Sequence, residues 1–499
     1  GSGGITSRDF VPLAALGELG MGISVRSLLF LFSAVTIIQK TAFGFANTQP
    51  PTQRHQSVGM DQLNDPLLSI IQRLFPDVDS YEIEENIKQA NAEGFGVTVN
   101  SIGKTLFVKR VEAVEYKHKP WGDLRRTLVY ARTEARFYAD ILPLLKENCQ
   151  LDWDIAPKCY LAETSLSGLI EDNESASAKE MESTDDPSYG EDDASILNGK
   201  GGLLVLDSLK EDFYQTSPLT PLEASKCLRA IARFHATAFQ DETILAVVSD
   251  KLCEYAGSYH LKNRNPKELK NIQNTWLEFC DGISAAAPDF FSKKSVQDLG
   301  KRVQDMAGFI SEELSPAYND NYATIVHGDY KAMNVFLPTM TDEREDEAHP
   351  IIIDFASTGV GLGMSDVAMH ITHALDPEHL VNGGEEAMVD GYLEALGEAL
   401  PEGCSYPREV ALRHYRLAVV DYFRFIMGRL WKGATLETFE KRKSSKNTVY
   451  VNRSVGAAVN FIERADRYLS EFEEERREKQ ERLLDGDFQA EEYLAAPQS

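Results

Sequence analysis

Cysteine is scarce in this sequence, and basic residues are few relative to acidic ones. The six cysteines include no Cys-x-x-Cys pair and do not cluster with histidines, so a thiolate metal site is not expected. A disulfide framework is not indicated either in a chain of 499 residues. The formal net charge of −27 argues against a nucleic-acid partner, because such a partner needs a basic face.

Much of the acidity is local. Residues 171–193 hold ten acidic side chains against Lys179 alone, and residues 342–347 hold five against Arg344. Charge runs of this kind are typical of solvated loops, so they do not describe an active site. We predict that residues 170–202 form a disordered insertion, because this segment cannot bury enough apolar surface to offset the entropy lost on ordering.

Long apolar runs are also missing, and the run at residues 28–38 is too short to span a bilayer comfortably. With Arg26 before it and small residues at 41–46 after it, this run predicts a targeting leader for the secretory pathway or a plastid. A buried hydrophobic helix in a cytoplasmic protein is the alternative. We expect residues 47–60 to be a linker, and we expect no stable membrane span once the leader is removed.

Two polar motifs between apolar strands carry the strongest functional information. The first, at residues 325–337, contains His327-Gly328-Asp329 and then Asn334; the second is an isoleucine-rich strand that ends at Asp354. Phosphoryl transfer needs a carboxylate that orients the attacking hydroxyl and oxygen ligands that hold Mg²⁺ on the phosphates of ATP. We predict Asp329 as the catalytic residue and Asn334 and Asp354 as the Mg²⁺ ligands.

The His-Gly-Asp motif, in place of His-Arg-Asp, resembles that of the aminoglycoside phosphotransferase and choline kinase group. Within this group the chain looks most like the ecdysteroid kinase-like, or CHK kinase-like, family, and its glycine-rich run at 359–363 followed by Asp366 is similar to the run in that family. The resemblance implies an α+β, two-lobed protein-kinase-like fold, with an antiparallel β N-lobe, one main helix there and a mostly α-helical C-lobe. Asp366 would brace the catalytic loop from below.

The N-lobe is predicted from strands at residues 81–88, 95–100 and 105–111. Lys109, on the third strand, falls where this fold would place the lysine that binds the ATP phosphates, and Lys104 is the second choice. The resemblance extends to a Glu-x-x-Phe-Tyr sequence in a helix, which implies that Glu134 pairs with Lys109. An ordinary surface glutamate is the alternative for Glu134.

The nucleotide contacts beyond Lys109 are less well marked. No Gly-x-Gly-x-x-Gly precedes this lysine, since only Gly94 and Gly96 flank the first turn. The strand predicted at 203–209 is similar to the family's hinge strand, which implies that backbone groups from Leu206 to Ser208 receive the adenine edge.

Beyond the hinge the periodicity predicts helices. They are expected at residues 221–239, 271–280, 296–314, 385–400, 408–430 and 471–482. His235 is interpreted as a packed helix residue, and Tyr422 and Trp431 as core side chains that could border an acceptor pocket. We divide the chain into a leader and linker at 1–60, an N-lobe at 61–206, a C-lobe at 207–470, and a charged helix and tail at 471–499.

The predicted function is transfer of the γ-phosphoryl group of MgATP to a hydroxyl of a small molecule. A protein kinase is disfavoured, because the link from Asp354 to Asp366 leaves little room for an activation segment and no Ala-Pro-Glu follows. Lys331, two residues after Asp329, would neutralise charge on the transferring group. A pseudokinase or interaction module without turnover is the alternative. A sterol, an amino alcohol, a sugar and an aminoglycoside all stay open as acceptors.

Overall fold

The computed structural model describes residues 65–88, 92–148, 154–171, 194–339 and 349–484. The chain divides into two compact units, Gly1–Asp65 and Pro66–Ser499, and the described residues belong almost wholly to the second. The predicted leader and linker, and residues 172–193 of the predicted insertion, therefore lie outside the described residues. None of the helices in the described ranges is long and apolar enough to cross a membrane.

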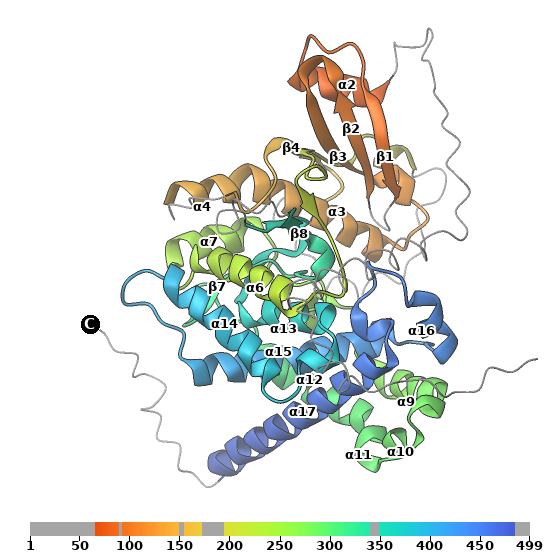
Figure 1. The fold of residues 1–499 in the computed structure, drawn as a ribbon, viewed down its shortest axis with the longest axis vertical. Coiled ribbons are helices and arrows are strands. Elements are labelled where there is room, and N and C mark those ends of the chain that lie inside the picture. The colour runs from red at the N-terminus through yellow and green to blue at the C-terminus, as the bar shows by residue number, and fades with distance from the viewer. Residues whose placement is uncertain (1–64, 89–91, 149–153, 172–193, 340–348, 485–499) are drawn as a thin grey trace, which may run out of the picture. The chain divides into compact units, whose positions relative to one another are not determined.

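The N-terminal lobe is built on a five-stranded antiparallel sheet with the strand order β1-β2-β3-β5-β4 (Figure 1). Its strands are β1 (Glu82–Lys88), β2 (Glu93–Val99), β3 (Lys104–Glu112), β4 (Cys159–Ser165) and β5 (Gly201–Asp207). The first three begin and end within two residues of the predicted strands. This sheet and the helical part that follows confirm the predicted α+β fold class.

Side chains alternate between the two faces of this sheet, and a different helix covers each face. The helix α2 (Pro66–Leu74) packs its buried Ile71 in one core with Leu106 and Val108 of β3. Val111, on the opposite face of β3, packs in a second core with Leu128 of α3 (Trp121–Arg136). Lys109 shares the face of Val111, so the alternation places it on the side of α3.

The helix α3 links the two lobes. Its first half packs in the small core under the sheet, as Leu128 shows, and it then passes through a wide π-helical turn at Phe137–Ile141 into α4 (Leu142–Asn148). Phe137 and Ile141 belong instead to the large core of the C-terminal lobe. The ring of Phe137 stacks on Phe355 with centroids 3.7 Å apart.

The C-terminal lobe is mostly helical. Its longer helices are α6 (Pro221–Ala236), α7 (Glu242–Lys251), α9 (Ile272–Ile283), α12 (Leu299–Glu313), α13 (Met364–Ala374), α14 (Gly384–Ala399), α15 (Arg408–Phe425) and α17 (Val455–Leu484). The shorter ones are α8 (Pro266–Lys270), α10 (Pro288–Phe291), α11 (Lys294–Gln297) and α16 (Leu436–Arg442). The short helix α5 (Ala194–Leu197) precedes β5 and belongs to the N-terminal lobe.

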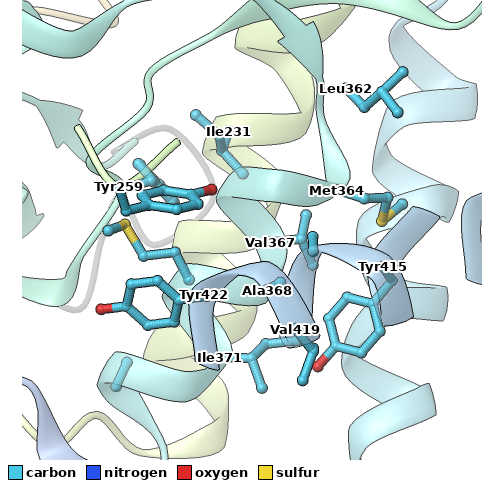
Figure 2. Packing of buried hydrophobic residues seen from close by; sticks show 14 of the residues in the cluster. Ile231, Tyr259, Leu362, Met364, Val367, Ala368, Ile371, Tyr415, Val419 and Tyr422 are labelled. Atoms are coloured by element: carbon cyan, nitrogen blue, oxygen red, sulfur yellow. The ribbon is translucent and has the colours of Figure 1, made fainter. Parts of the chain in front are cut away.

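The helix α13 lies at the centre of this lobe. Nearly all its residues are buried, including the polar Asp366, His370 and His373, and it packs against both α6 and α15. Figure 2 shows Val367 and Ile371 of α13 close to Val419 of α15, with Ile231 of α6 nearby. This packing holds α13 in place beneath the first polar motif.

Short strands carry both motifs. β7 (Ala323–Val326) pairs with β10 (Gly359–Leu362), and β6 (Phe213–Tyr214), β8 (Val335–Pro338) and β9 (Ile351–Ile352) form a three-stranded sheet. The first motif therefore connects β7 to β8, and the second follows β9. The pairing of β8 with β9 brings the two motifs together.

Three boundaries differ from the predictions. β5 begins at Gly201, inside the predicted insertion, and Ile170 and Leu197 at the two ends of that insertion are buried in the core under the sheet. The helix predicted at 471–482 is the last part of α17, which begins at Val455, so the domain boundary drawn after residue 470 falls inside a helix. At the ends of the insertion and in α17, apolar packing gives regular structure to residues that the charge pattern alone had assigned differently.

Candidate functional site

Lys109 makes two short contacts that join the lobes. Its Nζ donates to Glu134 Oε2 of α3 at 2.7 Å and to Asp354 Oδ1, just after β9, at 2.9 Å. The ion pair predicted between Lys109 and Glu134 is therefore present. Lys104, the second choice, instead donates to the Tyr160 hydroxyl at 2.9 Å.

The charges around Lys109 fix the protonation of the site. Burial alone would raise the pKa of Asp354, but the ammonium groups of Lys109 and Lys331 outweigh burial and hold this pKa at about 2. Burial would lower the pKa of Lys109, and the carboxylates of Asp354 and Glu134 outweigh it, so its pKa lies above the ordinary lysine value. At neutral pH Asp354 is thus an anion and Lys109 a cation.

The loop from His327 to Asn334 is held from beneath by Asp366 of α13. Its carboxylate accepts hydrogen bonds from the backbone N–H groups of His327 at 2.7 Å and of Gly328 at 2.9 Å. The same carboxylate contacts His235 Nε2 at 3.1 Å, and His235 is fully buried. Asp366 thus occupies the bracing position that the resemblance implied, and His235 is a packed residue, as expected.

Gly328 is required by the shape of this loop. Its φ is +79°, in the left-handed region that favours glycine. A Cβ added there would lie 2.3 Å from the Ser357 carbonyl oxygen and 2.6 Å from the Gly257 amide nitrogen. Backbone atoms cannot give way as a side-chain end can, so any other residue would displace the loop.

Asp329 lies at the exposed end of the loop with two polar neighbours. Its Oδ2 accepts from Lys331 Nζ at 2.7 Å and from the amide nitrogen of Asn334 at 3.1 Å. The Asn334 amide also donates to the backbone oxygen of Asp329 at 2.8 Å. The structure therefore brings together Asp329, Lys331 and Asn334.

Asn334 and Asp354 lie on adjacent segments. The N–H of Ile353 donates to the Asn334 backbone oxygen at 2.9 Å, so the two residues flank one hydrogen bond between the motifs. Asp354 has a φ of +68°, which is uncommon for a residue with a side chain. Strained backbone of this kind clusters at functional sites.

The two predicted metal ligands offer an ionised carboxylate and an amide oxygen, which are hard donors of the kind that Mg²⁺ prefers. Within the described ranges, no group of three or more His, Cys, Asp and Glu side chains could hold a metal ion by itself. A Mg²⁺ ion that also binds nucleotide phosphates needs only one or two protein carboxylates. The residues present fit such an ion.

The predicted hinge residues lie at the end of β5 and just after it. Leu206 lies inside β5, between β3 and β4, where the ladder uses its backbone. The N–H of Ser208 donates to the Thr105 carbonyl at 3.1 Å, and the N–H of Asp207 donates to the Lys158 carbonyl at 2.9 Å. These two N–H groups are engaged within the sheet, so an adenine edge would have to meet other backbone groups of this segment, and the hinge stays a prediction.

The glycines of the predicted nucleotide turn lie within β2. A Cβ on Gly94 would lie 2.7 Å from the ring of Phe107 on β3, so this glycine makes room for an aromatic side chain. Residues 89–91 of the turn are outside the described part of the chain. The role of Gly94 is thus explained by packing within the sheet.

A pocket of about 370 Å³ opens beside Asp329 and Lys331. One wall is apolar and consists of Met369, Tyr422, Phe425, Leu430 and Val449. The remaining lining is polar and consists of Ser258, His373, Arg442, Asn447, Thr448 and Asn452. The expectation for Tyr422 is met, whereas Trp431 does not line the pocket, since it is fully buried and stacks on Phe279 at 4.2 Å.

Sequence reasoning missed most of this lining. His373 lies one helical turn after Met369 on α13, and Arg442 and Asn452 come from a region with no predicted element. The run Lys441-Arg442-Lys443 in an acidic chain was the one available indication. Periodicity identifies the buried face of a helix but not the residues that face it from elsewhere in the chain.

A model of the ecdysteroid kinase-like family matches residues 103–403 of the chain. No curated protein sequence matches it significantly.

Solved structures are similar in fold at low sequence identity. A putative aminoglycoside phosphotransferase from Ralstonia eutropha JMP134 is 13% identical with a TM-score of 0.39, over 81% of this chain and 97% of its own. The choline kinase LicA from Streptococcus pneumoniae is 11% identical with a TM-score of 0.37, over 82% and 100%. The Plasmodium vivax ethanolamine kinase is 10% identical with a TM-score of 0.37, over 77% and 82%. These scores lie below 0.5, so the family assignment depends on the family model.

Proposed function

Because the chain belongs to the ecdysteroid kinase-like family, we propose that it transfers the γ-phosphoryl group of MgATP to a hydroxyl of a small molecule. The observation that carries the proposal is the position of Lys109 between Glu134 and Asp354, at 2.7 and 2.9 Å. A buried lysine shared by two carboxylates from different elements is poorly explained as a surface ion pair. It is well explained as a cation held in place for phosphate oxygens.

In this proposal each lobe supplies one part of the site. Lys109 binds nucleotide phosphates, and Glu134 keeps its side chain in position. Asp354 and Asn334 hold Mg²⁺, which supplies charge neutralisation on the phosphates when it is bound. Asp329 accepts a hydrogen bond from the acceptor hydroxyl and orients it toward the γ-phosphorus.

Lys331 would interact both with Asp329 and with the transferring phosphoryl group. Here it pairs with Asp329 at 2.7 Å. Burial would lower its pKa, but the carboxylates of Asp329 and Asp354 outweigh burial and raise it, so Lys331 stays protonated. A protonated Lys331 beside Asp329 would neutralise charge on the transferring phosphoryl group while Asp329 remains free on its other side for the hydroxyl.

The test is the effect of MgATP on the melting temperature of the whole chain and of Asp354→Asn. A ligand at about 100 times its Kd stabilises a protein by about 2.7 kcal/mol, so the wild type should show a clear increase in Tm. Asp354→Asn keeps the shape of the side chain but removes its charge, and we expect most of this increase to disappear. Asp390→Asn, an exposed carboxylate paired with Arg408, serves as the matched control and should keep it.

Two results would contradict the proposal, one of them its nucleotide binding and the other its turnover. The absence of any MgATP effect on wild-type Tm would contradict nucleotide binding altogether. An intact Tm increase with no ADP formed in the presence of hydroxylated small molecules would favour the pseudokinase alternative, in which the site binds nucleotide without turnover.

A further inference from the structure

The charged residues of the pocket beside Asp329 are mostly basic. Lys331 and Arg442 are its two cations, and Asp329 is its one acidic lining residue. Asp329 is already paired with Lys331 and hydrogen-bonded by Asn334. Arg442, at the last position of α16, makes no ion pair within the described residues. The whole chain has a net charge of −27, whereas the lining of this pocket has more basic than acidic residues.

Two buried polar atoms at the pocket lack hydrogen-bond partners, and a buried arginine lies next to one of them in the chain. His373 and Asn452 line the pocket, and each has a buried side-chain atom, Nδ1 and Oδ1 respectively, without a hydrogen-bond partner in the part of the chain that is described. Arg453, next to Asn452, is buried and binds only Ser217 and the face of Tyr450, with no carboxylate partner among the described residues. Arg453 does not itself line the pocket, but a buried guanidinium without a counter-ion leaves positive potential beside the lining residue Asn452.

The aromatic residues of the lining do not offer a binding site for a cation. An ammonium group can bind over aromatic faces, and Tyr422 and Phe425 are the aromatic residues of the lining. The guanidinium of Arg264 already lies over Phe425, 5.2 Å from the ring centroid. Tyr259 packs edge-on against Tyr422 with centroids 5.2 Å apart. The pocket thus has neither a spare carboxylate nor an open aromatic cage for an amine.

We propose that the acceptor is a hydroxy acid with a largely apolar body. Its hydroxyl would lie at Asp329, its body against Met369, Leu430 and Val449, and its carboxylate at Arg442. This inference rests on the proposed kinase function and names the substrate class of that site. An amine-bearing acceptor is disfavoured because it would place a cation beside Lys331 and Arg442.

The reaction that follows is balanced with ATP as the only co-substrate. The hydroxyl oxygen forms a bond to the γ-phosphorus while the bond from that phosphorus to the β–γ bridging oxygen breaks. The hydroxyl proton passes to Asp329, and ADP leaves with the electron pair of the broken bond. The products are ADP and a phosphate monoester of the hydroxy acid, whose carboxylate is unchanged.

The test uses three matched probes that share one medium-length aliphatic body and a terminal hydroxyl. One carries a carboxylate at its other end, the second the methyl ester of that carboxylate, and the third a primary amine. Binding to the full chain in the presence of MgADP is measured by calorimetry, and ADP formation with MgATP is measured separately. We expect the carboxylate probe to bind at least about tenfold more tightly than the ester, and the amine to bind most weakly.

The variant that isolates the proposed contact is Arg442→Gln. It should remove the preference for the carboxylate over the ester and leave binding of the ester within about twofold. Lys441→Gln is the matched control, because it makes the same change of charge at the neighbouring residue, whose exposed side chain pairs with Glu437. This control should retain the preference.

Three outcomes would overturn the acceptor class. They are equal binding of ester and carboxylate, tighter binding of the amine, and an unchanged carboxylate preference in Arg442→Gln. Failure of the kinase function looks different. If the carboxylate probe binds in an Arg442-dependent way but no ADP forms with MgATP, the pocket assignment stands and phosphoryl transfer does not.

Discussion

The loop from His327 to Asn334 and the pocket beside it meet at Asp329, yet they are built in different ways. The loop is fixed by hydrogen bonds that the backbone N–H groups of His327 and Gly328 donate to the Asp366 carboxylate. It is also fixed by Gly328, which no other residue can replace without moving the loop. The pocket is lined by side chains from α13, α15 and the end of α16. Changes in the pocket can therefore alter what is bound without disturbing the loop.

This difference predicts that substitutions at the loop affect the rate or the fold, whereas substitutions at the pocket affect the choice of acceptor. The strongest test is Asp329→Asn. The amide keeps the shape but cannot accept the hydroxyl proton, so kcat should fall by about 10²- to 10⁴-fold. The MgATP effect on Tm should persist, because Asp329 does not contact Lys109 or Asp354 in the described contacts. Steady-state kinetics of ADP formation measures the change.

The pocket variant Tyr422→Phe gives the contrast for that experiment, since it changes only a hydroxyl in the lining. It should alter KM for the acceptor far more than kcat. A wild-type kcat in Asp329→Asn would show that another residue is the catalytic carboxylate.

A smaller effect is expected at Asp366, which supports the loop but does not face the pocket. Asp366→Asn leaves one oxygen for two backbone N–H groups and turns an NH₂ toward one of them. We expect the free energy of unfolding to fall by about 3 kcal/mol, because hydrogen bonds to a buried charged group are lost. Urea denaturation at pH 7 measures this, and an equal loss in the exposed control Asp390→Asn would contradict the bracing role.

The smallest effect concerns pH and His370, whose ring lies against Tyr330 of the loop with centroids 5.0 Å apart. Burial lowers the pKa of His370 to about 4. The unfolded chain therefore binds a proton near pH 6.5 that the folded chain does not, and stability falls as the pH decreases below that value. From pH 7 to pH 5 this group should contribute a loss of about 2 kcal/mol.

His370→Gln should remove that contribution and flatten the decrease. Unfolding free energies at pH 7 and pH 5, in the variant and in the wild type, provide the measurement, with His118→Gln at an exposed histidine as the control. A decrease of the same steepness in His370→Gln would show that this histidine is not held neutral by the fold.

The sequence predicted the parts whose geometry is local. Gly328 and Asp329 belong to one short motif, and Lys109 lies on the third predicted strand, where the kinase-like fold would place the phosphate lysine, so their places could be anticipated. The pairing with Glu134 required the family resemblance, because a glutamate on a helix has no such mark of its own. The roles of these residues stay predictions until they are tested.

The remainder depends on contacts between distant segments. The hydrogen bond from the Ser208 N–H to the Thr105 carbonyl could not be predicted, because a hydrophobic pattern does not show where the hydrogen bonds between strands end. His373, Arg442 and Asn452 meet only after α13, α16 and the following segment pack together. The early start of α17 at Val455 was missed because its charged second half dominates the pattern.

The packing of α3 in the cores of both lobes limits how the lobes can move relative to one another. Leu128 anchors one end to the core under the sheet, and Phe137 anchors the other to the core of the helical lobe through its stack on Phe355. The lobes therefore cannot swing apart as two rigid bodies unless this helix bends or one anchor is released. The π-helical turn at Phe137–Ile141 is where bending needs the fewest regular hydrogen bonds to change. We expect any relative movement of the lobes to be a small flexing near this turn, which Lys109 would follow through its bond to Glu134.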